Sequence, residues 1–328
     1  MNIKILGIIL LSVITVVSVQ SQLKVDNTWQ KIESTGTIHP RHENAFVEVK
    51  GNFYLLGGRR IQTVNIFNPK ANTWTEASKP PMEIHHFQAV TYKNEIYLAG
   101  AMTGKYPRET AIDKVYIYNP KSDSWRAGFD LPSDRLRGSS GTVIYKDKLY
   151  LVCGIINGHY DGHVNWFDSY DFKTGTWEKL PDAPRVRDHF HAVVINDKLY
   201  VAGGRVTSKK EKKVFSQTIP EIDVFDFGTN TWSTLETKLP TLRAGTSTIA
   251  YGKYLIVIGG ESGTIKTAHN QVEVLDTESL QWIEFPTLAR GRHGTQTILY
   301  KDAMYIASGS GNRGGNPELN SIEKYSFK

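Results

Sequence analysis

A short pattern recurs six times along the chain, and this repetition constrains the fold more than any other feature. Each copy contains an apolar run that ends in two small residues, and successive copies lie 43 to 56 residues apart. Self-similarity at such a period is typical of architectures in which each unit packs against its neighbours. The six pairs of small residues are Gly57-Gly58, Gly100-Ala101, Cys153-Gly154, Gly203-Gly204, Gly259-Gly260 and Ser308-Gly309.

Two further markers keep a constant distance from these pairs. Five copies carry an aromatic residue or leucine seven positions before a tryptophan, and each pair follows an arginine, or Ile84 in one copy, by 16 positions. Chance does not explain three markers in one register. The tryptophans are Trp74, Trp125, Trp177, Trp232 and Trp282, and the arginines are Arg41, Arg137, Arg187, Arg243 and Arg292.

Each copy contains four strand-like runs, which we name a, b, c and d. In the first copy they are predicted at residues 44–49, 52–57, 63–67 and 73–77. Short polar turns such as residues 50–52 favour tight hairpins, and the apolar run b is typical of a strand covered on both faces. The sequence therefore predicts an all-β fold, a six-bladed β-propeller with four antiparallel strands per blade.

The glycine pair, the aromatic residue before tryptophan and the period resemble those of kelch repeats. The resemblance covers residues 27 to 328. Because the first 21 residues are predicted below to be a signal peptide, the chain is also similar to kelch proteins of a secreted bacterial type. It implies a kelch propeller. Kelch propellers often serve as protein-interaction modules.

The two ends of the repeat region complement each other. Residues 321–325 form a strand c with no tryptophan-bearing strand d after it, whereas Trp29 belongs to a strand d without a blade. We therefore expect the N-terminal strand to complete the last blade and close the ring, which removes exposed sheet edges.

The first 21 residues are predicted to be a signal peptide, and residues 22–328 a single propeller. Residues 5–19 are mostly apolar, and Ser21 is a small residue directly before a possible cut. An uncleaved membrane anchor is the alternative. We expect a secreted or periplasmic protein with no nucleic-acid partner and no membrane contact beyond the export signal.

Composition limits the chemistry. The single cysteine, Cys153, excludes an intrachain disulfide and a cysteine-based zinc cluster, and its place in strand b predicts a small packed side chain. This argues against the copper chemistry of galactose oxidase, which also carries kelch-like blades. No cofactor is expected. The formal charge of +6 permits anionic partners without selecting one.

Antiparallel strand order places the b–c and d–a loops on one face, where strand a begins. The five arginines that precede strand a are expected at the mouth of the central channel on this face. There they are candidate substrate-binding residues, because guanidinium groups bind carboxylate or sulfate groups well. The alternative is that each arginine bonds carbonyl and carboxylate groups of the blades.

Two residues are candidate catalytic groups. Glu261 directly follows the fifth pair, and this position is similar to that of the catalytic glutamate in kelch-type sialic acid mutarotases. The resemblance implies proton transfer at the anomeric centre. His189 and His191 begin an inner strand, as His85 and His86 do in another copy, and a histidine base beside an arginine would also suit a polysaccharide lyase.

Two loops carry other ligand-like side chains. His159, Asp161 and His163 stand at alternate positions and could hold a metal ion, although solvated loop side chains are the simpler interpretation. We assign no metal ligand. The lysine-rich run at residues 209–213 is interpreted as an exposed loop tip, with a polyanion clamp as the alternative.

These observations favour an exported kelch-repeat protein that binds or processes an acidic carbohydrate, such as a sialic acid, a uronate or a sulfated polysaccharide, at the channel mouth. A non-catalytic protein-interaction propeller is the first alternative, and a polysaccharide lyase is the second. If the chain is an enzyme, we expect a sugar mutarotase or epimerase, or a lyase.

Overall fold

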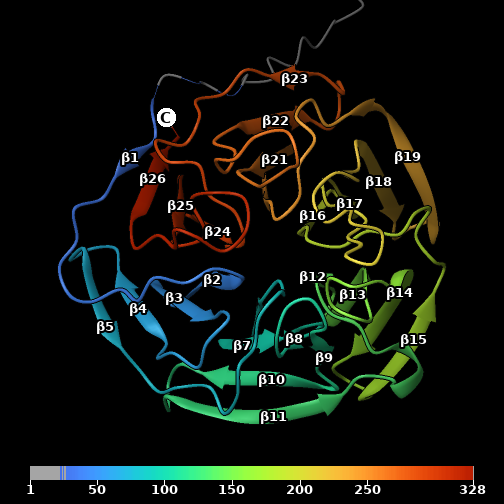
Figure 1. Ribbon diagram of the computed structural model, residues 1–328, viewed down its shortest axis with the longest axis horizontal. Coiled ribbons are helices and arrows are strands. Elements are labelled where there is room, and N and C mark those ends of the chain that lie inside the picture. Colours follow the sequence, from blue (N-terminus) through green and yellow to red (C-terminus); the bar gives the residue numbers. More distant parts are fainter. Residues whose placement is uncertain (1–22, 24, 26, 328) are drawn as a thin grey trace, which may run out of the picture.

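Six four-stranded antiparallel sheets surround a central channel in the computed structural model (Figure 1). The structure describes residues 23, 25 and 27–327, so the predicted signal peptide lies outside the described residues. The all-β fold, the six blades and the four strands per blade are confirmed. Among the described residues, no helix is long and apolar enough to cross a membrane.

The predicted strands of the first copy agree closely with the observed blade 1. This blade contains β2 (Asn44–Val49), β3 (Asn52–Gly57), β4 (Asn65–Asn68) and β5 (Thr73–Glu76). Blade 2 contains β6 (Val90–Tyr92), β7 (Glu95–Leu98), β10 (Lys114–Asn119) and β11 (Ser124–Asp130), and a small hairpin, β8 (Met102–Thr103) and β9 (Thr110–Ala111), lies in its b–c loop.

The remaining blades follow the same order. Blade 3 follows a short 3-10 helix at Ser133–Arg135 and contains β12 (Gly141–Tyr145), β13 (Lys148–Ile155), β14 (His163–Asp171) and β15 (Thr176–Leu180). Blade 4 contains β16 (Ala192–Ile195), β17 (Lys198–Val201), β18 (Glu221–Asp226) and β19 (Thr231–Lys238). Blade 5 contains β20 (Ser247–Tyr251), β21 (Tyr254–Ile258), β22 (Val272–Asp276) and β23 (Trp282–Ile283).

Blade 6 joins both ends of the chain, as predicted. It contains β24 (Thr297–Tyr300), β25 (Ala303–Ala307), β26 (Ile322–Ser326) and the N-terminal β1 (Gln30–Lys31). Gln30 pairs with Lys324, and the amide of Ile32 donates to the carbonyl of Ile322 at 2.9 Å. Figure 1 shows β1 beside β26, near the C-terminus.

The marker tryptophans connect neighbouring blades. The indole nitrogens of Trp177 and Trp232 donate to the carbonyls of Asp130 and Pro181, at 2.8 Å and 2.7 Å. Trp74, like Trp29 directly before β1, is buried, whereas Trp125, Trp177, Trp232 and Trp282 are only partly buried. The tryptophans thus support the blade contacts, and their outer edges remain near the surface. Cys153 is buried and free, as expected.

Candidate functional site

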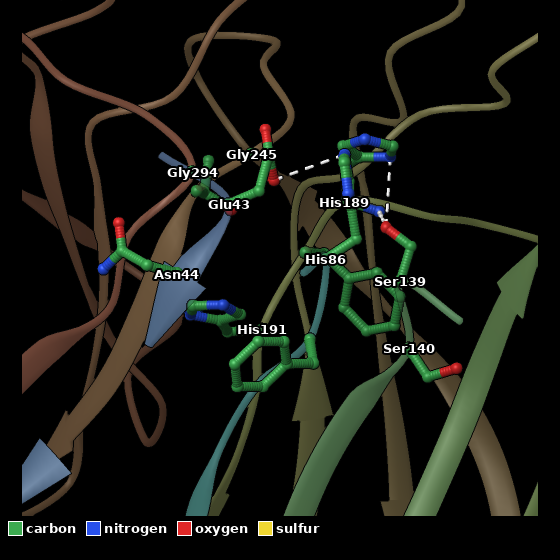
Figure 2. Close-up of a pocket in the computed structure, with 12 residues that line it drawn as sticks. Glu43, Asn44, His86, Ser139, Ser140, His189, His191, Gly245 and Gly294 are labelled. Carbon is green, nitrogen blue, oxygen red and sulfur yellow. Dashed lines mark hydrogen bonds and ion pairs between the residues drawn. The ribbon is translucent and has the colours of Figure 1, made fainter. Parts of the chain in front are cut away.

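Six residues, one before each inner strand, surround the channel axis (Figure 2). Each lies two positions after the arginine marker or its Ile84 equivalent, and all six have a left-handed backbone with φ between 52° and 63°. Such a conformation persists in non-glycine residues only where the surroundings enforce it. We call these residues the channel ring: Glu43, His86, Ser139, His189, Gly245 and Gly294.

Hydrogen bonds along the backbone hold the channel ring together. Amide groups of one blade donate to carbonyls of the previous blade, and at one junction the hydroxyl of Ser139 accepts from His189 N at 3.1 Å. Asn44 N donates to Gly294 O at 3.2 Å and so closes the circle between the first and last blades. The other bonds are His86 N to Glu43 O, Ser139 N to His86 O, Gly245 N to His189 O and Gly294 N to Gly245 O, at 3.2, 2.9, 2.6 and 3.0 Å.

A cavity of about 430 Å³ lies at the channel mouth. The b–c loops of blades 1, 4, 5 and 6 contribute charged side chains or backbone groups to its wall. Blades 2 and 3 contribute the rings of Tyr106 and His159. The b–c loops and the starts of the inner strands therefore share one face, as antiparallel order predicted. The charged and imidazole side chains that line the cavity are His42, Glu43, Arg59, Arg60, His86, His159, Arg205, Glu261, His293 and Glu318.

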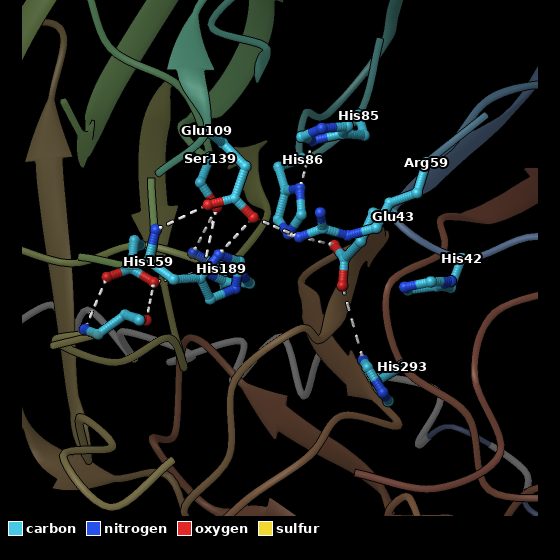
Figure 3. A network of polar contacts seen from close by, with 12 residues as sticks. His42, Glu43, Arg59, His85, His86, Glu109, Ser139, His159, His189 and His293 are labelled. Atoms are coloured by element: carbon cyan, nitrogen blue, oxygen red, sulfur yellow. Dashed lines mark hydrogen bonds and ion pairs between the residues drawn. The ribbon is translucent and has the colours of Figure 1, made fainter. Parts of the chain in front are cut away.

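Three buried histidines meet at one side of this cavity (Figure 3). His86 and His189 come from the channel ring, and His159 comes from the b–c loop of blade 3. The three ring centroids are 4.8 to 5.0 Å apart, and one nitrogen of each ring lies within 4.8 Å of the others. We call these three residues the histidine cluster.

Buried carboxylates support the histidine cluster from behind. Glu109 Oε1 lies 2.9 Å from His159 Nδ1 and 2.5 Å from Arg59 Nη2, and Asp188 contacts the Nδ1 atom of His189. Burial alone would raise the pKa of Glu109, but its contacts with His159 and Arg59 hold that pKa well below the usual range. Both carboxylates therefore remain charged at neutral pH.

Glu261 lies at the cavity wall, but its carboxylate is fully engaged. It accepts hydrogen bonds from Arg205 Nη1 at 2.5 Å and Gly314 N at 2.8 Å, and it lies 3.4 Å from His293 Nε2. Burial would raise the pKa of Glu261, yet the charges of His293 and Arg205 and these hydrogen bonds lower it well below its usual value. A general base works best with a pKa near the operating pH, so this environment suits a binding group better than a base.

The five marker arginines are buried inside the blades, with at most 1% of each residue exposed. Each guanidinium group bonds carbonyls of its own blade, and four of them also contact a carboxylate. This placement corrects the expectation that they present their charges at the channel mouth, because burial leaves no surface for a ligand. The residues concerned are Arg41, Arg137, Arg187, Arg243 and Arg292.

Replacing one of these arginines is expected to destabilise the fold. Arg137 lies 2.8 Å from Asp168 and donates to the carbonyls of Leu151 and Cys153, so Arg137→Ala leaves a buried carboxylate with Arg135 alone. We expect chemical denaturation to show a loss of about 3–5 kcal/mol. Arg126→Ala, which breaks the surface pair with Glu95, is the control and should cost about 1 kcal/mol or less. Equal losses in the two variants would contradict the structural role.

The family model of the KLHDC2/KLHL20/DRC7 Kelch-repeats domain matches residues 86–309, which is more than half of the chain. The chain belongs to the kelch-repeat family. This kelch protein is 28% identical over 306 residues to Kelch-like protein terF of Aspergillus terreus, with 86% of this chain and 64% of the relative covered. It is 26% identical over 306 residues to human Kelch-like protein 23, with 91% and 51% covered.

The chain thus spans between half and two thirds of the length of these two relatives. Among solved structures, that of YjhT superposes on this kelch protein with a TM-score of 0.72 and 15% identity, covering 88% of this chain and 96% of that one. At this identity the likeness concerns the fold alone.

The structure brings together some predicted site residues of this kelch protein and separates others. Glu261 and His159 line the cavity and His189 packs against His159 from the channel ring, whereas Asp161 bonds Asn157, and His163 lies 3.1 Å from Asp188. His159 is therefore grouped with histidines of other blades, not with its neighbours in the loop.

Sequence reasoning missed Arg59, Arg205, Glu43 and Glu109 as site residues. Two positions of the repeat, the one directly after the small pair and the channel-ring position, could have indicated three of these four residues. Arg59 and Arg205, like Glu261, directly follow the small pair of their copies, and Glu43 occupies the channel-ring position. Glu109 has no such signal, because the irregular b–c loop of blade 2 carries it.

Proposed function

We propose that this kelch protein binds an acidic carbohydrate at the channel mouth. The main support is the cavity of about 430 Å³, where Arg59, Arg60 and Arg205 alternate with carboxylates and imidazoles. Its volume is within the usual range for small-molecule sites. Hydroxyl groups of a sugar can both donate to the carboxylates and accept from the guanidinium groups.

A second cavity of about 360 Å³ adjoins the first and adds positive charge beside it. Tyr106, Val214 and Phe215 line both cavities, and Lys209, Lys212 and Arg313 line the second one alone. Aromatic rings can stack on the apolar face of a sugar ring, and the cations favour carboxylate or sulfate groups on the next sugar. An anionic oligosaccharide would fill both cavities.

Binding of sialic acids, uronates and sulfated oligosaccharides should be measured by calorimetry. Because Arg60 and Lys209 are exposed at the two cavities, Arg60→Ala and Lys209→Ala should each weaken binding about 3- to 10-fold, and added salt should weaken it further. Lys146→Ala, on the a–b turn of blade 3 at the opposite face, is the control. Absence of binding by all these ligands, or equal loss with Lys146→Ala, would contradict the proposal.

Turnover needs a separate measurement. If Glu261 or His189 transfers a proton, anomeric exchange of a bound sugar followed by NMR should be accelerated by the wild type, and either Glu261→Gln or His189→Gln, whichever removes the acting group, should abolish that acceleration. The engaged carboxylate of Glu261 favours binding without turnover. Cleavage of a uronate polymer with formation of an unsaturated product would instead support the lyase alternative.

A partner protein is the second candidate ligand. Of the five large hydrophobic side chains that are exposed among the described residues, Ile61, Tyr106, Leu242 and Ile265 lie in b–c or d–a loops of the cavity face. Exposed apolar side chains gathered on one face can form a protein-binding surface. If this candidate is correct, Ile61→Asp combined with Ile265→Asp should abolish partner capture and leave sugar binding unchanged.

We also propose that the chain is exported to the periplasm or the medium, on the basis of the apolar segment at residues 5–19. Mass spectrometry of the mature protein from each cell fraction tests this localisation.

A further inference from the structure

We propose that His86, His159 and His189 form a binding site for a divalent transition-metal ion at one side of the channel-mouth cavity. The site goes beyond carbohydrate binding, because it concerns the histidine cluster alone and can be tested without any sugar. Four observations carry the proposal: ring spacing, tautomers, supporting carboxylates and local charge.

The spacing of the three rings matches that of imidazoles around one ion. A zinc or similar ion lies about 2.0–2.1 Å from its imidazole nitrogen and so about 3.2 Å from the ring centroid, which places centroids about 4.5–5.2 Å apart for angles between about 90° and 109°. The observed centroid distances are 5.0, 4.9 and 4.8 Å, and the rings meet edge to face at 79°, 79° and 66°. The centroid spacing therefore fits three rings around one ion, and the ring nitrogens, now within 4.8 Å of one another, would rotate to about 3.3 Å apart to bind it.

Hydrogen bonds leave the Nε2 lone pairs of His159 and His189 available. Each ring donates from Nδ1 to a carboxylate, Glu109 for His159 and Asp188 for His189. Nε2 is then unprotonated in the neutral ring. The Nε2 atom of His189 is buried and has no hydrogen-bond partner among the described residues, so its lone pair is free to bind an ion.

A hydrogen bond with His85 determines which nitrogen of the His86 ring carries the proton. His85 Nε2 lies 3.2 Å from the carbonyl oxygen of Gly104, which can only accept, so His85 Nε2 carries the proton and its Nδ1 is an acceptor. His86 Nδ1, at 2.6 Å from that atom, must therefore donate. His86 Nε2 is consequently unprotonated and accepts a long hydrogen bond from Arg59 Nη2 at 3.4 Å, which a bound ion would replace, and Glu43 Oε2 lies 3.5 Å away.

The surroundings resemble those of metal sites in proteins. A ligating histidine usually donates its other ring nitrogen to a carboxylate, as His159 and His189 do here. Imidazole ligands suit zinc, copper, nickel or iron better than magnesium or calcium.

Charge also favours a cation. Glu43, Glu109, Asp188 and Glu261 contact the cluster or the cavity beside it, whereas Arg59 and Arg205 are the cations that pair with them. A divalent ion would offset the excess of buried negative charge. Glu43 is placed to supply a fourth ligand, and positions that face the cavity would remain for water or for a bound ligand.

The test is metal binding by the full mature chain after removal of metals with a chelator. We expect calorimetry to show one Zn²⁺ per chain, and Co²⁺ to give visible absorption bands of a four- or five-coordinate ion with nitrogen ligands. His159→Ala and His189→Ala should each weaken Zn²⁺ binding at least 100-fold, and Glu109→Gln should weaken it 10- to 100-fold. His42→Gln is the matched control, because His42 lines the same cavity but pairs with Glu318 outside the cluster.

Several outcomes would overturn the site. These are no Zn²⁺ binding by the wild type, a stoichiometry other than one, or an affinity that His189→Ala leaves unchanged. If the alanine variants do not fold, the wild-type Co²⁺ spectrum decides, because an octahedral, water-like spectrum would contradict histidine ligation. Zinc binding without sugar binding would support this site and contradict the proposed function, and the converse result would do the opposite.

Discussion

Trp29→Ala is expected to lower the free energy of unfolding by about 3–5 kcal/mol, although residue 29 lies near the N-terminus. Trp29 is 5% exposed, and its ring centroid lies 5.8 Å from that of Tyr325 in a core that includes Phe285 and Phe327. The substitution leaves a cavity between two chain ends that together form blade 6. Urea denaturation measures the loss.

Gln30→Ala is the matched control, because this side chain is exposed in the same strand and its backbone pairing with Lys324 remains. It should change stability by about 0.5 kcal/mol or less. A chain that begins at Thr35 lacks β1 altogether and should melt at a lower temperature than either variant. If that shortened chain melts together with the full mature chain, β1 does not close the ring.

Acid is expected to destabilise this kelch protein well above the pH at which carboxylates alone would act. Burial, with the charge of Arg59, lowers the pKa of His85 to about 4, and burial lowers the pKa of His191 to about 4. Both rings are neutral when folded, and both bind a proton near pH 6.5 when unfolded. Stability is therefore complete above pH 6.5 and decreases as the pH falls from 6.5 to 4, by about 3 kcal/mol for each histidine.

Urea denaturation between pH 7 and pH 4 measures this dependence. Lowered carboxyl pKa values at Glu109 and Glu261 add a further loss at lower pH, because protonation breaks their contacts with Arg59 and Arg205. His191→Asn should reduce the slope between pH 6.5 and 4, whereas His39→Gln, at an exposed ring, should not. A slope that is the same in all three proteins would contradict a neutral, buried His191.

The fold could be predicted from the sequence because the repeat encodes it several times over. The strands of blade 1 agree with the predicted residues to within two positions, since apolar alternation and polar turns specify strand ends locally. Closure by β1 was also predictable. The predicted strand near Trp29 had no blade of its own and the last copy lacked its strand d, so pairing the two completes blade 6.

The site was harder to predict because its residues come from the parts of each copy that differ. Arg41 and its equivalents recur with the blades, and the structure shows that they recur because each one bonds the carbonyls of its own blade. His86 and His189 occupy the same repeat position in two different blades, whereas His159 comes from the b–c loop of a third, so only the assembled ring shows that the three meet. The arginines that recur in nearly every copy thus indicate what stabilises the blades, whereas residues that differ between copies line the cavity.

The six residues of the channel ring share one backbone conformation, whereas their side chains differ. The same left-handed conformation occurs at Glu43, His86, Ser139 and His189 as at the two glycines, so the circle depends on a side chain only where the Ser139 hydroxyl accepts from His189 N. Each blade therefore offers one exchangeable position that faces the axis, and related propellers can acquire new ligands there without redesigning a single strand. Gly245 and Gly294 have no side chains of their own, and His293 and Glu43 occupy the space beside them, so the imidazoles of the circle lie on one flank.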